Sequence, residues 1–576
     1  MQTFVRPFAE KIAAVIDMPV EDVVALISTP PRPDMGQLAF PCFQLAKARR
    51  EAPPKIAAAI AEQLQVDPQD GSGLTRISAA GPYVNAFLDG AVVGAQVFSA
   101  ALTQGQRFGC LDSGAGQVVT VDYSSPNIAK SFGIHHLRST VIGHALVGML
   151  EAAGYKPVGI NHLGDWGTQF GQLLAIWTEE GDESRLADEG IDYLLSLYVE
   201  FNRRKEVDPA LQERARACFA SLEQGDAESR RLWKLFRDTS MAEFERVYKR
   251  LGIHFDDTRG ESYYEGLMAA ILTELEEKGL LSESRDATVV DLEAHELGVA
   301  LVRKSDGSTL YLTRDLASAD FRRNEYGFVR SLYVVGGAQA LHFAQMIKVL
   351  ELLGRDWADA IEHVPFGLMR FKDRKMSTRK GDIIRLADVL DRAVAMARET
   401  MESGARDKGR ALPDDIDEVA HRIGVGAVVF NDLKNRRQRD VIFDWDEMLS
   451  FEGETGPYLQ YTAARIASMI DKYGAEPRSD VDWQLVSGPG ELDLALALDG
   501  LSTALNRGVT ESEPSLVADQ LLTIAARFST LYSNRNWKVL SDDAELSAAR
   551  MALAAAARQA LVNGLGWLGI PVPDRM

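Results

Sequence analysis

Residues 118–160 restrict the fold more than any other part of the chain. An apolar, β-branched run at 118–123 predicts a buried strand, and the Ser-Ser-Pro-Asn that follows is typical of a turn. Apolar residues recur at three- and four-residue steps from about 134 to 153, which predicts a helix, and 157–160 predicts a second strand. Strand, helix and strand in succession form a βαβ unit, so we expect an α/β fold with a doubly wound parallel sheet. Ligands bind such sheets at the carboxyl ends of the strands, here around residues 124–136.

The composition is that of an ordinary globular chain. Of 576 residues, 46% are hydrophobic and 25% are charged, which excludes gross disorder and fibrous repeats. The 63 Lys and Arg against 83 Asp and Glu give a formal net charge of −20. A net negative charge argues against a protein that binds nucleic acid through its overall electrostatic field, but it does not exclude a local stripe of basic residues.

Cysteine usage and hydropathy exclude further classes of protein. Three widely spaced cysteines and the absence of C-x-x-C argue against a disulfide framework or a zinc ribbon, so we expect no protein-bound structural metal. The most apolar long stretch, at 551–572, is interrupted by polar residues and is too polar for a membrane span. Charged residues precede any apolar run at the N-terminus, unlike in a secretory signal. We therefore expect a cytoplasmic protein with no membrane partner.

Three parts follow one another along the chain. Residues 1–110 are nearly neutral and predict a small α+β module, with expected helices at 4–27, 40–50 and 54–64 and a strand pair at 77–88. Residues 111–385 hold the βαβ unit, a polar helical insertion at about 175–255, and expected strands at 289–292, 298–303, 309–312 and 331–335. From 386 to 576, helical periodicity and an alanine-rich composition predict an all-α helical bundle.

Two basic segments point to phosphate binding. The predicted helix start near 134 is an anion site by geometry, and it is surrounded by Lys130, His135, His136 and Arg138. The loop 370–381 is cationic at six of its twelve positions. Taken alone, each segment is explained better by solvated charge; together they predict a nucleotide site with a mobile phosphate clamp. Because no Walker loop is present, such a site would hold the nucleotide in another way.

A third polar segment spans residues 305–317. Asp306-Gly307 predicts a hairpin turn, and Tyr311 and Asp315 follow at an expected strand end and helix start. Taken alone, Asp315 is explained equally well as an ordinary carboxylate in the first turn of a helix.

Five separated motifs agree with one family. They are Ser125-Pro126-Asn127-Ile128-Ala129-Lys130, Asn161-His162-Leu163-Gly164-Asp165-Trp166-Gly167-Thr168-Gln169, Tyr311-Leu312-Thr313-Arg314-Asp315, Gly456-Pro457-Tyr458-Leu459-Gln460-Tyr461 and the terminal Pro573-Asp574-Arg575-Met576. With these motifs the chain resembles an arginyl-tRNA synthetase, one of the class I aminoacyl-tRNA synthetases, over essentially its whole length. The resemblance implies an arginine–tRNA ligase that forms arginyl-adenylate from L-arginine and ATP, with Mg²⁺ on the nucleotide, and passes the arginyl group to the 3′ end of tRNA(Arg). It also implies that activation requires tRNA, and we expect a monomer.

The resemblance also implies a function for each of the three parts of the chain. Residues 1–110 would be the additional domain that contacts the tRNA elbow and D-loop, 111–385 a Rossmann-like class I catalytic domain, and 386–576 the anticodon-binding domain. Contacts to tRNA would come from Asn85, Arg436, Tyr458, Tyr461, Tyr532, Trp537 and Met576. Aromatic residues on helices more often belong to a core, and that alternative stays open.

Both class I signatures are present in altered form. The HIGH signature falls at Gly133-Ile134-His135-His136, where Gly133 stands in place of the usual first histidine and His135 in place of the usual glycine. The KMSKS signature falls at Lys375-Met376-Ser377-Thr378-Arg379, where Thr378 replaces the second lysine and Lys130 would take over its role. A rival hypothesis is therefore a catalytically weakened paralogue that binds tRNA or arginine as a regulator.

The resemblance implies three groups of site residues. The catalytic group is Lys130, His135, His136, Lys375, Ser377 and Arg379, and ATP would also contact Gly133 and Met376. Arginine would bind in a pocket whose carboxylates match the guanidinium fork, made by Asn127, Glu261, Tyr311, Asp315 and Gln339. His162 and Asp165 either line the same cleft or are structural, and His342 and His363 are interpreted as core or rim histidines.

Overall fold

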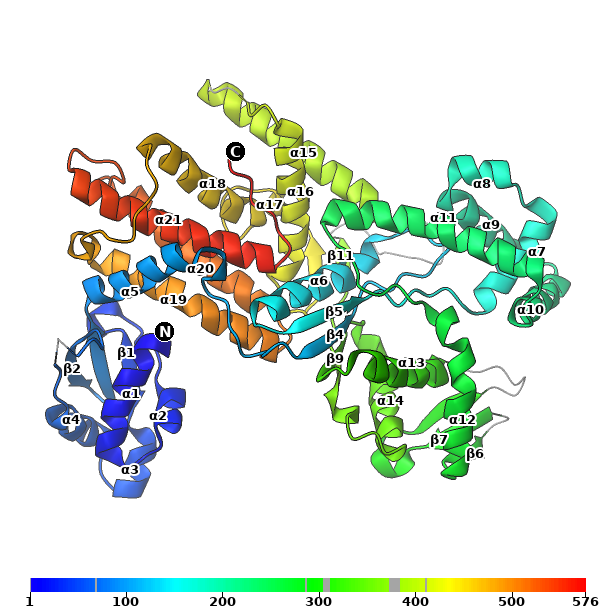
Figure 1. Ribbon diagram of the computed structural model, residues 1–576, viewed down its shortest axis with the longest axis horizontal. Coiled ribbons are helices and arrows are strands. Elements are labelled where there is room, and N and C mark those ends of the chain that lie inside the picture. Colours follow the sequence, from blue (N-terminus) through cyan, green and yellow to red (C-terminus); the bar gives the residue numbers. More distant parts are fainter. Residues whose placement is uncertain (1, 68–69, 285–286, 304–310, 372–383, 410–411) are drawn as a thin grey trace.

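The computed structural model describes residues 2–67, 70–284, 287–303, 311–371, 384–409 and 412–576. Figure 1 shows an elongated molecule with an N-terminal module at one end, a helical insertion at the other, and a parallel sheet with the C-terminal helices between them.

The N-terminal module combines helices with a small antiparallel sheet of order β1-β3-β2. Its elements are α1 (Gln2–Ile16), α2 (Val20–Leu26), β1 (Leu38–Pro41), α3 (Phe43–Arg49), α4 (Pro53–Gln63), β2 (Leu74–Ala80) and β3 (Tyr83–Leu88). The strand pair expected at 77–88 is confirmed. The helix expected over 4–27 is two helices, because Asp17 has a φ of +52° through which a right-handed helix does not continue. Residues 40–41 belong to β1, so the helix expected over 40–50 begins later than predicted.

A four-stranded sheet of order β10-β9-β4-β5 forms the centre, and every neighbouring pair in it is parallel. Its strands are β4 (Val118–Asp122), β5 (Lys156–Ile160), β9 (Arg330–Tyr333) and β10 (Ile361–His363). The predicted βαβ unit is confirmed: a 3-10 turn, η3 (Ile134–His136), and α6 (Leu137–Ala152) connect β4 to β5. Helix α14 (Ala340–Leu352) connects β9 to β10 in the other direction along the sheet. The chain order therefore reverses between β4 and β9, and ligands bind at such switch points.

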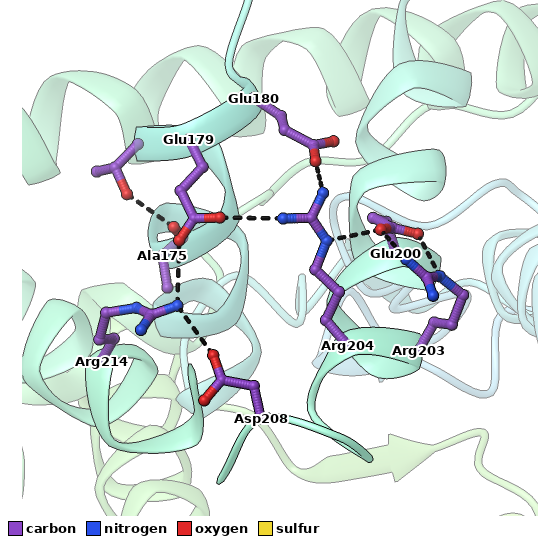
Figure 2. A network of polar contacts seen from close by, with 9 residues as sticks. Ala175, Glu179, Glu180, Glu200, Arg203, Arg204, Asp208 and Arg214 are labelled. Carbon is purple, nitrogen blue, oxygen red and sulfur yellow. Dashed lines mark hydrogen bonds and ion pairs between the residues drawn. The ribbon is translucent and has the colours of Figure 1, made fainter. Parts of the chain in front are cut away.

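The first insertion after β5 is helical. It consists of α7 (Thr168–Glu180), α8 (Glu183–Glu189), α9 (Ile191–Arg204), α10 (Pro209–Glu223) and α11 (Ala227–Leu251). Ion pairs on its surface join the helices: Arg204 reaches Glu179 at 3.0 Å and Glu200 at 2.6 Å, and Arg214 reaches Glu179 at 3.1 Å (Figure 2). Each exposed pair contributes at most about 1 kcal/mol, so the buried apolar faces hold this insertion together.

The second insertion is a separate lobe. It contains η4 (Glu261–Leu267), α12 (Met268–Glu277) and an antiparallel sheet of β6 (Leu281–Ser284), β7 (Ala287–Asp291) and β8 (Val299–Arg303), followed by α13 (Tyr311–Tyr326). The strands expected at 289–292 and 298–303 are thus present, but apart from the parallel sheet. The strand expected at 309–312 is wrong for residues 311–312, which begin α13. Leu312, Leu316 and Ala319 are buried at helical spacing, and this packing overrides the local strand propensity. Residues 309–310 and the turn expected at 306–307 lie outside the described residues.

The C-terminal part is a helical bundle. Its helices are α15 (Leu386–Lys408), α16 (Ile416–Leu433), α17 (Trp445–Met448), α18 (Gly456–Tyr473), α19 (Pro489–Thr510), α20 (Ser515–Ser533) and α21 (Ala544–Trp567). Alanine-rich α21 is buried on almost all sides, because small side chains let α18, α20 and α5 (Gly90–Gln104) approach it closely. One short strand, β12 (Val441–Phe443), interrupts the helices and pairs in parallel with β11 (Met369–Phe371). Among the described helices, none is long and apolar enough to cross a membrane.

Candidate active site

A cavity of about 390 Å³ lies at the switch point of the parallel sheet. Its walls come from the loop after β4, the start of α6, η4, α13 and the start of α14, so segments far apart in the sequence meet there. Six residues predicted from the sequence line this cavity: Asn127, His135, His136, Glu261, Asp315 and Gln339.

One wall of the cavity carries the HIGH-like segment. Gly133 pairs with Arg385 in a backbone bridge, so residues 384–386 are fastened to the segment at 132–134 that leads into α6. The rings of His135 and His136 lie 4.0 Å apart. Burial and the neighbouring His135 lower the pKa of His136 to about 3. His135 is more exposed, and partial desolvation together with the nearby Lys130 lowers its pKa. Both shifts favour the neutral imidazole, which has one N–H donor and one acceptor nitrogen and carries no positive charge.

Lys130 supplies positive charge next to these histidines. It lies outside the cavity lining but close enough to contribute to the lowered pKa of His135. Its ammonium group lies 5.5 Å from the ring centroid of Tyr198 on α9, within the range of a cation–π contact. The first insertion thus holds the lysine that stands beside the HIGH-like segment.

Another wall of the cavity is acidic. Burial raises the pKa of Glu261 to about 7, although Arg314, 3.3 Å away, lowers it. The Oδ2 atom of Asp315 lies 2.6 Å from Nε2 of His342, and this hydrogen bond raises the pKa of His342. Two carboxyl groups in a partly buried wall can bind a planar cation such as a guanidinium through charge-assisted hydrogen bonds.

The His-Leu-Gly-Asp motif after β5 supports the cavity. Glycine is required at Gly164, because a Cβ there would collide with Oδ1 of Asn127. Asp165 is buried and accepts hydrogen bonds from Ser262 N at 2.8 Å and Ser262 Oγ at 2.9 Å, which holds the start of η4. His162 lines the cavity. Of the two alternatives left open by the sequence, His162 belongs to the cleft and Asp165 to its support.

Several lining residues are not assigned to the site by the sequence, among them Ser139, Tyr333, His342, Phe343 and Phe366. For His342 the sequence indicates only a core or rim residue. Its contact with Asp315 depends on the packing of α13 against α14, which no local pattern shows. One signal was available, because His342 follows Gln339 by three residues, which is nearly one helical turn.

The KMSKS-like second signature, which holds Lys375, Met376, Ser377 and Arg379, lies outside the described residues. The side chain of Tyr311 also lies outside them, and its backbone begins α13.

The predicted tRNA contacts of the C-terminal bundle fall into two kinds. Tyr461 on α18 and Tyr532 on α20 flank Arg465, whose guanidinium lies 4.5 and 5.0 Å from their ring centroids. Tyr458 lies on α18 and is hydrogen-bonded to Ser529. Trp537, by contrast, is 6% exposed and donates to the Glu491 carboxylate, as a core residue does.

The other predicted tRNA contacts are dispersed. Asn85 lies on the central strand β3, is 1% exposed, and its Oδ1 has no hydrogen-bond partner among the described residues. Arg436 is exposed and lies 4.0 Å from the Glu511 carboxylate. Met576 packs against the core of the bundle.

A parallel sheet with a histidine-bearing helix start at its switch point, followed by a helical bundle, defines a class I aminoacyl-tRNA synthetase. The family described as "tRNA synthetases class I (R), catalytic domain" matches residues 97–445. The "Arginyl tRNA synthetase N terminal domain" matches residues 4–88, and the "DALR anticodon binding domain" matches residues 459–576.

Full-length relatives identify the member of this class. Arginine–tRNA ligases of Clostridium perfringens and Clostridium beijerinckii are 43% and 44% identical to the chain over 573 and 568 residues, 99% of either length. The solved arginyl-tRNA synthetase of Thermus thermophilus shares the fold, with a TM-score of 0.80 at 24% identity over 99% of this chain and 100% of that one. The chain belongs to the arginyl-tRNA synthetase family.

Proposed function

We propose that the chain is an arginine–tRNA ligase, which activates L-arginine with ATP to arginyl-adenylate and transfers the arginyl group to tRNA(Arg). The observation that carries this proposal is a single cavity lined both by Glu261 and Asp315 and by the HIGH-like histidines. The carboxyl groups suit the arginine side chain, and the imidazole and ammonium donors suit phosphate oxygens. Membership of the family supports the same reaction.

In this proposal the acidic wall selects arginine. Glu261 and Asp315 receive the guanidinium, and the remaining contacts come from Asn127, Gln339 and Tyr311. A guanidinium is planar and offers five N–H donors in a fixed fork, so it can donate paired hydrogen bonds to two carboxylates. A lysine ammonium is a point charge and cannot donate paired hydrogen bonds to both carboxylates in this geometry.

The HIGH-like wall receives ATP. The carboxylate of arginine attacks the α-phosphate, and pyrophosphate leaves, so negative charge builds on phosphate oxygens and preorganised donors lower the barrier. His135 and His136 donate as neutral imidazoles, Lys130 supplies positive charge, and the second signature would add Lys375, Met376, Ser377 and Arg379. The imidazole and ammonium groups of this wall suit phosphate oxygens, and an ammonium cannot coordinate a metal ion. Mg²⁺ would therefore enter with ATP and be held by the phosphates of the nucleotide.

The exchanged HIGH positions are compatible with this activity. Gly133 is extended and buried against Arg385, while the His135 side chain reaches the cavity. We infer that Gly133 leaves space and that the His135 ring packs against adenine or a phosphate. The rival hypothesis of a regulatory paralogue finds no support among the relatives, which are arginine–tRNA ligases.

The flanking parts would recognise tRNA. We propose that residues 1–110 contact the elbow and D-loop and that 386–576 bind the anticodon. Asn85 is 1% exposed, so it lies beneath that first interface rather than in it. Ring faces beside a cation, as at Tyr461, Arg465 and Tyr532, suit stacked bases. Trp537 is buried and is better explained as core. The requirement for tRNA in activation, the monomeric state and the cytoplasmic location stay predictions.

Charging of tRNA(Arg) with labelled amino acids by the purified chain tests the proposal. With ATP and Mg²⁺ present, we expect arginine to be attached and lysine to remain a poor substrate. Absence of arginine charging would overturn the proposal and restore the hypothesis of a regulatory paralogue.

A further inference from the structure

Helix α11 of the first insertion presents one face to the loops around the cavity. Trp233, Arg237, Ser240, Phe244 and Tyr248 recur at steps of four, three, four and four residues, so they share a face. Figure 1 shows α11 extending from the insertion towards the central sheet. The reaction proposed above gives this face no role, although four of its five residues contribute polar groups.

The loop after β4 has an unfavourable backbone conformation. Among the described residues, eight that are not glycine have a positive φ, and three of them fall in this loop: Ser124 at +68°, Ser125 at +47° and Ala129 at +60°. L-residues rarely adopt this region, and such conformations persist only where the surrounding structure holds them. The loop contains Asn127 and leads into Lys130, so the strain lies where the substrates would bind.

The Tyr248 hydroxyl holds the first two of these residues. It lies 2.9 Å from Ser124 Oγ and accepts a hydrogen bond from Asn161 Nδ2 at 3.1 Å. The side-chain oxygen of Asn161 accepts a hydrogen bond from Ser125 N at 3.2 Å. Ser139 Oγ accepts one from Ser124 N at 2.9 Å. Because Tyr248 is 4% exposed, no water competes readily for these bonds.

Ser240 holds the third residue, and the rest of the face holds the neighbouring turn. The hydroxyl oxygen of fully buried Ser240 accepts a hydrogen bond from Ala129 N at 2.8 Å. Two turns earlier, Trp233 Nε1 donates to Asp165 O at 2.7 Å, and Arg237 Nε lies 3.4 Å from the Asp165 carboxylate. Asp165 is the residue that holds the start of η4, so one helix face supports two walls of the cavity.

We propose that α11 is a positioning element of the active site. Tyr248 and Ser240 hold the strained loop 124–129 in the geometry that the reaction requires, and Trp233 and Arg237 hold the turn at Asp165. None of these four side chains lines the cavity. Each acts through residues that line the cavity or lie next to it. The inference rests on the proposed function, because a positioning role needs a reaction to report it. A merely structural role would lower stability and leave the rate of the folded enzyme unchanged.

The first test compares Tyr248→Phe with Tyr193→Phe in the full chain. Tyr193 is also buried, lies on α9, and donates its hydroxyl proton to Glu180 O, outside the cavity lining. In arginine-dependent pyrophosphate exchange with tRNA present, we expect Tyr248→Phe to lower kcat on the order of tenfold, with KM for arginine and ATP within about threefold, because misplaced groups slow chemistry more than binding. The melting temperatures of the two variants should agree within about 2 °C.

The second test makes the same comparison at Ser240, the other α11 residue that holds the strained loop. Ser240→Ala should also lower kcat about tenfold, and Thr239→Ala should stay within about twofold of the parent, because the Thr239 hydroxyl bonds to the carbonyl of Leu235 in the same helix. If both anchor variants have kcat within about threefold of their controls, the positioning role is wrong. It is equally wrong if activity is lost only in proportion to the fraction of unfolded protein, measured by circular dichroism. A parent that does not charge tRNA(Arg) would instead overturn the proposed function, and the inference with it.

Discussion

Glu261 should make the binding of arginine depend on pH close to neutrality. Burial raises the pKa of Glu261 to about 7; Arg314 opposes this shift, and Asp315 and Asp165 add to it. A carboxyl group is protonated below its pKa, and only the ionised form attracts the cationic side chain of arginine. Affinity for arginine should therefore fall as the pH falls through 7, and it should be fully present above that value.

The size of the effect follows from the ionised fraction. With a pKa of about 7, roughly nine tenths of Glu261 is ionised at pH 8 and roughly one tenth at pH 6. The apparent dissociation constant of arginine should rise about tenfold between these values, since only the ionised fraction is competent to bind. This change corresponds to about 1.4 kcal/mol. By linkage, binding at pH 7 should release about half a proton, because occupied Glu261 is ionised.

Isothermal titration calorimetry of the full chain with L-arginine, in two buffers of different ionisation enthalpy, measures both quantities. Glu261→Gln should bind weakly and lose the pH dependence. Glu265→Gln is the matched control, because Glu265 also contacts Arg314 but lies outside the cavity lining. A flat profile for the parent would refute the reasoning. A Glu261→Gln profile as steep as that of the parent would also refute it and would direct attention to His342, whose pKa is raised by its hydrogen bond to Asp315.

Other measurements test neighbouring parts of the molecule. Asp315→Asn should weaken arginine binding by about 2–5 kcal/mol, because it removes one partner of a desolvated charge pair, and an unchanged KM for arginine would remove Asp315 from the pocket. His136→Ala should slow activation roughly 10²–10³-fold and His135→Ala less, in exchange assays across ATP concentrations; equal kcat losses would mean that His135 has a phosphate role. Arginine-dependent pyrophosphate exchange should be nearly absent without tRNA, and with tRNA it should weaken as salt rises; strong exchange by tRNA-free protein would contradict this. Asp432→Ala should destabilise the fold by about 3–5 kcal/mol, because Arg138, 2.9 Å away and 1% exposed, would be left buried and unpaired; an unchanged melting temperature would speak against it.

The parallel sheet could be predicted because its signals are local. An apolar run, a turn and a helical stripe at 118–160 are each read within a few residues, and their order alone implies parallel strands. The error at 311–312 has the opposite cause. That segment has the residue types of a strand, but its leucines are buried at helical spacing in one cluster with α12, β7 and β8, and local propensity does not include that packing.

The site was predicted unevenly for a related reason. Asn127, His135 and His136 follow a strand end and start a helix, so the switch-point rule places them at a ligand site from sequence alone. Glu261 and Gln339 have no local feature of comparable strength and entered only through the family resemblance, and the local pattern explains Asp315 equally well as an ordinary helix-start carboxylate. Their meeting in one cavity depends on how η4, α13 and α14 pack at the end of the sheet.

The sequence by itself determined the βαβ core, the helical C-terminal part and the altered HIGH segment, because residue type and periodicity are properties of neighbouring residues. The tertiary structure alone decided the protonation states and the supports. His136 is neutral and Glu261 titrates near 7 because burial penalises charge, and burial is set by segments distant in the chain. In the same way, the hydrogen bonds between the strained loop and the hydroxyl groups of Tyr248 and Ser240 exist only because α11 packs against the loop after β4, more than a hundred residues away in sequence.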